Sequence, residues 1–115
     1  MPKTVAIIGA SADPTKYSNK AIKAYRAQGW TVYPVNPNLD EVEGLPCYKS
    51  IEDVPEPIDR ISVYVPPAIG KQLLHSIAKK KHTELYINPG AEDTELIELA
   101  KSLDLNPIYA CSILA

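Results

Sequence analysis

Short apolar runs alternate along the chain with segments whose apolar residues recur every three or four positions. The runs are rich in β-branched residues, which favours strands, and they cover residues 4–8, 31–35, 58–65, 85–87 and 107–110. The spacing between them predicts helices over residues 20–27 and 68–80, and a third from Asp93 or Thr94 to about Leu103. The alternation predicts an α/β fold, a mostly parallel five-stranded sheet with helices on both faces.

The longest segment without a clear pattern covers residues 39–57, which hold a glycine and three prolines. We expect a loop here, with a short strand near residues 45–47 and one helical turn at residues 50–54. Because the segment is long and rich in proline, we expect it to be the most mobile part of the protein.

The first apolar run ends in a turn of small residues, Gly9-Ala10-Ser11. Small side chains let a ligand approach the backbone, and Ser18 or Asn19 is expected to cap the helix that follows. Free amides at such a helix start attract phosphate. A nucleotide-type ligand and an ordinary strand–turn–helix both fit this stretch, because Ser11 and Pro14 stand where a full G-x-G-x-x-G has glycine.

Composition narrows the class of protein. The 115 residues suit one domain, residues 1–115, with a net charge of −2 and no basic block except residues 79–82 at a predicted helix end. Cations there suit the helix dipole, so nucleic-acid binding is not predicted.

No apolar run is long enough to span a membrane, and no signal peptide is visible, so we expect a cytoplasmic protein. Two cysteines and two histidines without metal-ligand spacing predict no metal site.

Small, polar or rigid residues follow each predicted strand, in the order Gly9-Ala10-Ser11, Asn36-Pro37, Pro66-Pro67, Asn88-Pro89-Gly90 and Cys111-Ser112. In a parallel sheet these points share the carboxyl edge, where open α/β sheets bind ligands. No acid stands after the second strand before Asp40, which counts against NAD, and the lack of an arginine there counts more weakly against NADP. FMN stays open.

Catalytic residues are hard to assemble from this sequence. No Ser/His/Asp set is apparent, and the acids near residues 92–95 complement a helix dipole. Cys111 is the only nucleophile expected at the carboxyl edge, and it fits a packing role equally well. We therefore predict no catalytic residues.

Five motifs in register, at residues 5–11, 35–37, 63–67, 87–90 and 110–112, resemble those of the single-domain CoA-binding proteins. That family is similar to the CoA-binding domain of the succinyl-CoA synthetase α subunit and of ADP-forming acyl-CoA synthetases. The resemblance covers almost the whole chain. It implies a Rossmann-like fold, with the strand order of flavodoxin, and coenzyme A as the bound ligand.

The resemblance also assigns parts of the ligand to residues. Gly9, Ala10 and Ser11, followed by Lys16, Tyr17 and Ser18, would lie near the CoA phosphates, and Asn36 and Pro37 beside the adenosine. The remaining residues are Val65, Pro66 and Pro67 along the nucleotide, then Asn88, Pro89, Gly90 and Cys111 toward the pantetheine arm. Relatives often carry a lysine after the Asn-Pro, where this chain has Asn38-Leu39-Asp40, so the partner of the CoA 3′-phosphate is open, with Lys16 or Lys20 as candidates.

The resulting expectation is a small non-catalytic protein that binds CoA or acyl-CoA, with no nucleic-acid or membrane partner and with any protein partner unknown. Two alternatives remain. In the first, the chain is the CoA-holding subunit of a split acyl-CoA ligase, which the resemblance to the synthetase α subunit suggests. Ligase activity of the chain by itself is not expected, because it has no room for the phosphorylated histidine and the grasp domain of the larger synthetases. Alternatively, it is an NAD(P)-binding regulatory module.

Overall fold

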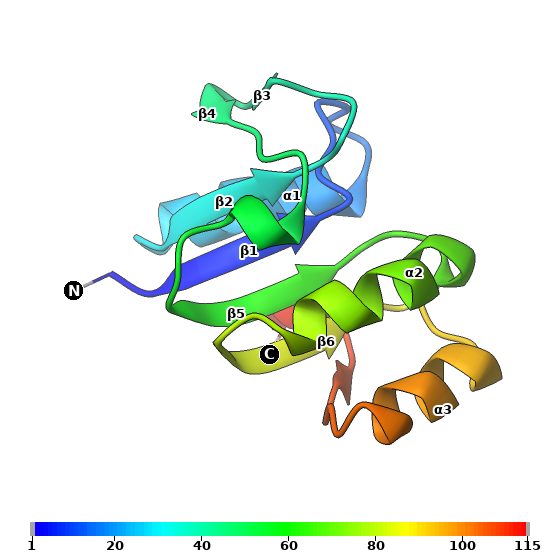
Figure 1. The fold of residues 1–115 in the computed structure, drawn as a ribbon. Coiled ribbons are helices and arrows are strands. Elements are labelled where there is room, and N and C mark those ends of the chain that lie inside the picture. The colour runs from blue at the N-terminus through cyan, green and yellow to red at the C-terminus, as the bar shows by residue number, and fades with distance from the viewer. Residues whose placement is uncertain (1, 115) are drawn as a thin grey trace.

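One parallel sheet of five strands forms the centre of the protein, seen in a computed structural model that describes residues 2–114 (Figure 1). The strand order is β2-β1-β5-β6-β7. The strands are β1 (Thr4–Ile8), β2 (Thr31–Val35), β5 (Ile58–Val63), β6 (His82–Ile87) and β7 (Ile108–Tyr109). Strand β2 lies at one edge of the sheet beside β1, and β5, β6 and β7 follow on the other side of β1. This order confirms the predicted Rossmann-like fold with flavodoxin-like order.

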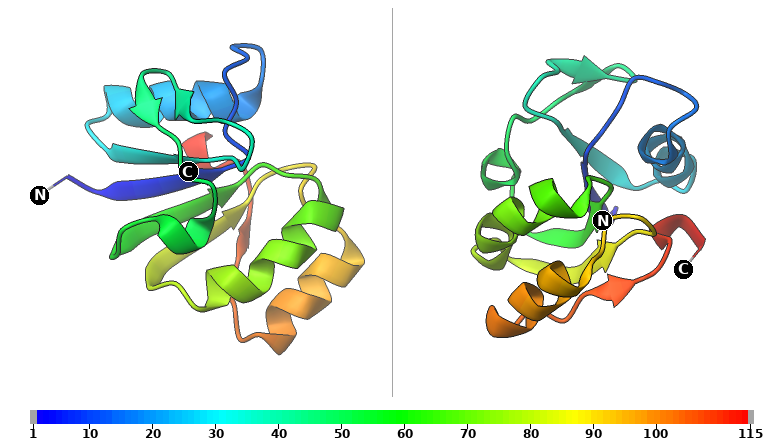
Figure 2. Two further views of the ribbon diagram at one scale, coloured as in Figure 1. Left: turned by 45° about the horizontal axis from the view of Figure 1, so that its top comes forward. Right: turned by 90° about the vertical axis from the view of Figure 1, so that its right-hand side faces the viewer.

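Three α-helices cover the two faces of the sheet. Helix α1 (Tyr17–Ala27) lies on one face, whereas α2 (Pro67–Ala78) and α3 (Thr94–Ser102) lie side by side on the other (Figure 2). The alternation of β1 explains this division, because Val5 and Ile7 pack toward α1 while Ala6 and Ile8 pack toward α2 and α3. Both faces of β1 are buried, as its continuous apolar run predicts.

The segment between β2 and β5 is more regular than its sequence indicates. Strands β3 (Glu41–Val42) and β4 (Leu45–Pro46) form an antiparallel hairpin, and β4 matches the short strand expected near residues 45–47. The two turn residues, Glu43 and Gly44, have φ values of 52° and 77°, as a two-residue type I′ turn requires. The predicted helical turn is the 3-10 helix η1 (Ile51–Asp53), where the Glu52 amide donates to Ser50 Oγ at 3.1 Å.

The beginning of α1 differs from the prediction. The helix starts at Tyr17, its N-cap is Lys16, and no side chain caps it, so the expectation that Ser18 or Asn19 caps a helix starting at residue 20 is wrong. The reason is tertiary. Both residues are buried in the first turn, and the Asn19 amide donates to Ser11 O at 2.9 Å and to Glu43 Oε2 at 3.0 Å.

Other boundaries shift by one to three residues, as helix and strand ends commonly do. The sheet pairing of β5 ends at Val63, α2 ends at Ala78, and β6 begins at His82. Helix α3 starts as expected, because Asp93 Oδ1 accepts from the Leu96 amide at 2.8 Å.

The helices of residues 2–114 are all too short or too polar to cross a membrane. Cys47 and Cys111 are free thiols.

Candidate functional site

A cleft of about 660 Å³ opens at the carboxyl ends of β1, β2, β5 and β6. Its volume falls within the range of about 300–1,000 Å³ that small-molecule sites have. Its lining residues are Gly9, Ala10, Ser11, Lys16, Tyr17, Ser18, Asn36, Tyr64, Val65, Pro66, Asn88, Pro89, Gly90, Ala91, Cys111 and Leu114. The topology therefore brings residues from five separate segments of the chain to one place.

All but two of the site residues that the sequence predicted lie around this cleft. The exceptions are Pro37, which is exposed in the turn after β2, and Pro67, which forms the first residue of α2. Three lining residues, Tyr64, Ala91 and Leu114, were not predicted. Tyr64 lies inside the strand-end motif of residues 63–67, so the sequence contained a signal for it, but no sequence signal points to Leu114.

The turn after β1 is packed too tightly for a side chain at Gly9. Its φ is +88°, and a β-carbon built there would lie 2.9 Å from Val65 Cγ1. The amides of Gly9 and Ala10 both donate to Val35 O, at 3.0 and 3.2 Å. These two amides are already bonded within the protein, so an anion at this end of the cleft would have to use other donors.

Two helices begin beside the cleft without a side-chain cap. Helix α1 begins after Lys16 and α2 begins after Pro66; neither has a side-chain cap or an acidic residue in its first turn. By contrast, α3 is capped by Asp93 and carries Glu95. Free helix N-termini carry partial positive charge, so this arrangement favours an anionic ligand.

The charged side chain in the cleft is positive, like the helix N-termini beside it. Lys16 is the one charged residue among those that line it, within the part of the chain that the structure describes. The other candidate lysine, Lys20, does not line the cleft, and its Nζ lies 5.1 Å from the ring centroid of Tyr17. Lys16 is therefore better placed than Lys20 to meet a phosphate.

Side-chain hydrogen bonds hold the loops that form the β1 end of the cleft. Asn36 Nδ2 donates to Ala10 O at 2.8 Å, and Asn36 Oδ1 accepts from the Asn38 amide at 2.8 Å. Asp13 Oδ1 accepts from both the amide and the hydroxyl of Thr15, at 2.9 and 2.7 Å. The Thr15 amide lowers the pKa of the Asp13 carboxyl below its ordinary value, so this turn is made by the ionised form.

Tyr64, which follows β5, and Cys111, which follows β7, also line the cleft. The Tyr64 hydroxyl is 3.3 Å from Ser112 Oγ, and burial raises the pKa of this phenol. The group is therefore neutral at physiological pH and acts as a hydrogen-bonding and packing side chain. No histidine or carboxylate lines the cleft among residues 2–114, and the ionisable side chains of its lining are Lys16, Tyr17, Tyr64 and Cys111.

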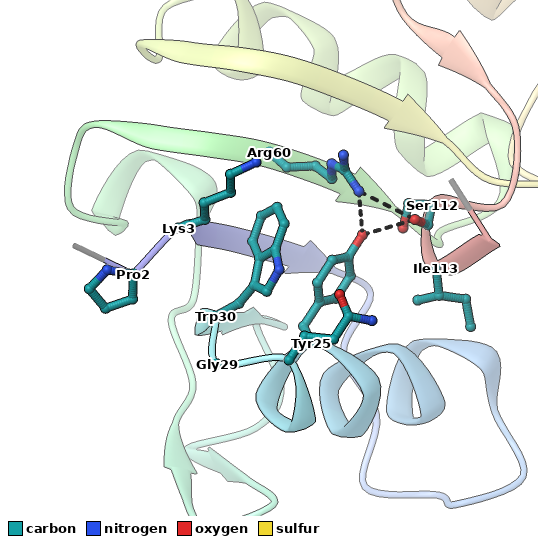
Figure 3. Close-up of a pocket in the computed structure, with 9 residues that line it drawn as sticks. Pro2, Lys3, Tyr25, Gly29, Trp30, Arg60, Ser112 and Ile113 are labelled. Atoms are coloured by element: carbon teal, nitrogen blue, oxygen red, sulfur yellow. Dashed lines mark hydrogen bonds between the residues drawn. The ribbon is translucent and has the colours of Figure 1, made fainter.

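A second cavity, of about 490 Å³, lies near the amino ends of β1 and β2 (Figure 3). Arg60 crosses it, with its guanidinium carbon 4.5 Å from the ring centroid of Tyr86 and 5.2 Å from that of Trp30. The same guanidinium pairs with Glu84 at 2.9 Å and donates to Tyr25 Oη at 3.1 Å. Because its donors serve protein groups, Arg60 has a structural role here. The sequence pattern did not predict this cavity.

Comparisons with known proteins find a family model and several relatives that match this chain. A family model described as "CoA binding domain" matches residues 3–115. The chain is 39% identical over 79 residues to an ADP-forming acetate–CoA ligase of Methanocaldococcus jannaschii, covering 69% of this chain and 11% of that protein. It is also 39% identical over 80 residues to the ADP-forming acetate–CoA ligase II subunit alpha of Pyrococcus furiosus, covering 69% of this chain and 18% of the relative. The chain thus spans less than a fifth of these curated relatives.

Solved structures show the same fold in both small and large proteins. A conserved hypothetical protein from Pyrococcus furiosus has a TM-score of 0.86 and 34% identity, with 99% of this chain and 98% of that one covered. A dinucleotide-forming acetyl-coenzyme A synthetase 1 of Ca. Korarchaeum cryptofilum, in complex with phosphate and ADP, has a TM-score of 0.79 and 28% identity. That match covers 96% of this chain and 26% of the synthetase.

Proposed function

Because the chain belongs to the CoA binding domain family, as the match over residues 3–115 shows, we propose that it binds coenzyme A or an acyl-CoA in the cleft. The observation that carries this proposal is the lining of the cleft, which joins Lys16 and two uncapped helix N-termini to a mostly apolar surface without acids. CoA has the matching chemistry, with phosphates at one end and a long, weakly polar pantetheine arm at the other.

The proposal orients the ligand along the cleft. The phosphates lie near Ser11, Lys16 and the start of α1, where positive potential is concentrated. The adenosine lies beside Asn36 and along Val65 and Pro66, and the pantetheine arm runs toward Gly90 and Cys111. Lys16 is our candidate for the 3′-phosphate, because Lys20 does not reach the cleft lining.

We further propose that this chain binds its ligand without catalysing a reaction and that it acts in the cytoplasm. The absence of histidine and carboxylate from the described cleft lining supports the first part. A binding protein of this kind would hold, deliver or sense CoA.

Calorimetric titration with CoA, acetyl-CoA, NAD, NADP and FMN tests the proposal. We expect CoA or acetyl-CoA to bind at least roughly tenfold more tightly than the other three, since only they fill both parts of the cleft. Lys16→Ala should weaken CoA binding, whereas Lys23→Ala, an exposed residue of α1 outside the cleft, should not. Failure of CoA to bind at millimolar concentration, together with clear NAD binding, would refute the proposal.

A second candidate is the CoA-holding subunit of a split acyl-CoA ligase. The observation that favours it is the 39% identity to a ligase subunit alpha of Pyrococcus furiosus, of which this chain covers only 18%. Such a role requires a partner that supplies the remaining parts. Recovery of a nucleotide-binding subunit in a pull-down, with CoA-dependent nucleotide turnover by the pair, would support this candidate, and neither result is expected for a self-sufficient binding protein.

An NAD(P)-binding regulatory module is the least supported candidate. The turn after β2, where NAD sites hold an acid for the ribose, contains Asn36 and Asn38. The next acid, Asp40, is directed elsewhere, since its Oδ1 pairs with Lys49 Nζ at 2.8 Å. The same titration decides against this candidate if neither NAD nor NADP binds.

A further inference from the structure

Asn88 lines the cleft, yet its side-chain amide is already bonded inside the protein. The residue follows β6 directly and is only 3% exposed. Its Nδ2 donates to Ser62 Oγ at 2.8 Å and to Val63 O at 3.0 Å, and its Oδ1 accepts from the Ser112 amide at 2.9 Å. An asparagine amide carries two N–H donors, so Asn88 has no donor left for a ligand.

Ser112, the partner of Asn88, is bonded through all of its polar groups. It is 1% exposed, and its Oγ lies 2.7 Å from Ser62 Oγ. Its carbonyl accepts from the Tyr25 hydroxyl at 3.2 Å and from Arg60 Nη1 at 3.3 Å, as Figure 3 shows. These partners belong to α1, to β5 and to the end of β6, so Ser112 is fixed relative to both the sheet and the helix. A buried polar network with every member satisfied is rigid.

Two residues close to Ser112 in the chain line the cleft. Cys111 and Leu114 line it, and Ser112 begins the short 3-10 helix η2 (Ser112–Leu114) between them. Ser62, in contrast, contacts both Asn88 and Ser112 without lining the cleft. Ser62 thus helps to hold the side of the cleft that Cys111 and Leu114 form, although Ser62 itself does not line the cleft.

We propose that Asn88 is a positioning residue. Together with Ser62 it holds Ser112, so that Cys111 and Leu114 form one side of the cleft and set how tightly the pantetheine arm of CoA binds. The inference rests on the proposed function, because it takes CoA as the ligand with its arm beside Cys111. Asn88 acts through Ser112 and does not itself bind the ligand.

Comparing CoA with ADP, which keeps the adenosine and the diphosphate but lacks the pantetheine arm and the 3′-phosphate near Lys16, tests the proposal. Dissociation constants are measured by calorimetry for the parent, Asn88→Ala, Ser62→Ala and, as a control, Ser102→Ala, whose exposed hydroxyl bonds only within α3. We expect Asn88→Ala and Ser62→Ala each to weaken CoA roughly tenfold, the effect of losing about one hydrogen bond, and ADP less than about twofold. Ser102→Ala should change neither affinity.

Two binding results would overturn the proposal. If Asn88→Ala weakens CoA and Ser62→Ala does not, Asn88 contacts the ligand directly. If CoA and ADP weaken equally in both variants, the network only supports the fold. Circular dichroism checks that each variant is folded, and Ser62→Ala alone carries the comparison if Asn88→Ala does not fold.

Hydrogen exchange in the free protein separates this proposal from the proposed function. We expect the amides of Ser112 and Leu114 to exchange faster in both variants, because they lose the bonds that hold the segment. Unchanged exchange would overturn the positioning role even if CoA binds the parent. If the amides exchange faster in the variants but the parent does not bind CoA, the network positions this segment and the proposed function is overturned, and with it the link to pantetheine.

Discussion

Gly9 and Val65 lie so close together that a β-carbon on Gly9 would stand 2.9 Å from Val65 Cγ1. The same β-carbon would be 3.2 Å from the carbonyl carbon of Tyr64, and the φ of Gly9 is +88°. Two independent constraints therefore demand glycine here, one from the local backbone and one from the neighbouring strand end. The close approach brings the β1 turn and the end of β5 together at the cleft.

Replacing Gly9 should cost more stability than replacing a glycine with the same backbone but open surroundings. Gly90 is the matched control, because its φ is +92° and nothing lies within 4 Å of a β-carbon there. We expect Gly9→Ala to lower the free energy of unfolding by about 3 kcal/mol and Gly90→Ala by about 1 kcal/mol. Urea denaturation followed by circular dichroism measures both, and equal losses would show that the contact with Val65 relaxes without cost.

Arg60 should tolerate lysine poorly despite the retained charge. Its guanidinium pairs with Glu84 and donates to Tyr25 and Ser112 while lying over aromatic rings. A lysine ammonium cannot maintain this planar geometry, so we expect Arg60→Lys to lower the free energy of unfolding by about 2 kcal/mol.

Arg26→Lys is the control for this change, because Arg26 is exposed at the end of α1 and its guanidinium donates to Glu43 O at 2.9 Å. Its effect should stay within about 0.5 kcal/mol. Chemical denaturation followed by the fluorescence of Trp30, the single tryptophan, reports both variants. A parent-like Arg60→Lys would mean that the guanidinium network adds nothing to stability.

The two cysteines should differ in how CoA affects their alkylation. Cys111 lines the cleft and Cys47 does not, so under the proposed function CoA protects Cys111 from iodoacetamide and leaves the rate at Cys47 unchanged. Burial raises the pKa of the Cys47 thiol, so its thiolate fraction is small at pH 7.5 and its reaction should accelerate as the pH rises. Peptide mass spectrometry measures both rates. If CoA protects Cys47 and not Cys111, the ligand binds at a site other than the cleft.

The turn at Asp13 should weaken in acid. The pKa of this carboxyl is lowered first by the Thr15 amide and then by the Thr15 hydroxyl. A folded pKa below the unfolded value of about 3.9 means that the contribution is complete above that pH and is lost as the pH falls through the folded value. Carboxyl-carbon NMR should therefore give Asp13 a midpoint below the ordinary aspartate value.

Thr15→Val tests the cause of this shift. It removes the hydroxyl donor and keeps the amide, so the Asp13 midpoint should rise only part of the way to the ordinary value. Thr83→Val, an exposed threonine in β6, is the control and should leave the midpoint unchanged. A full return to the ordinary value in Thr15→Val would assign the whole shift to the hydroxyl.

The pattern of the sequence determined the architecture and the location of the cleft. Alternating strand and helix segments with right-handed crossovers form a parallel sheet, and a parallel sheet puts all strand ends at one edge whatever its strand order. The pattern therefore predicts that the turn residues at those ends, from Gly9 to Asn88, come together, and they line one cleft. Local signals also placed the Asp93 cap and the short strand β4 correctly.

Tertiary structure alone decided what those residues do. The amide of Asn88, predicted as a ligand contact, is bonded to Ser62, Val63 and Ser112, and Asn19 joins two loops instead of capping α1. Such bonds join residues far apart in the chain, 87 positions in the case of Tyr25 and Ser112. Periodicity and turn chemistry reflect energies between near neighbours, whereas the partner of a buried polar group depends on which segments packing brings beside it.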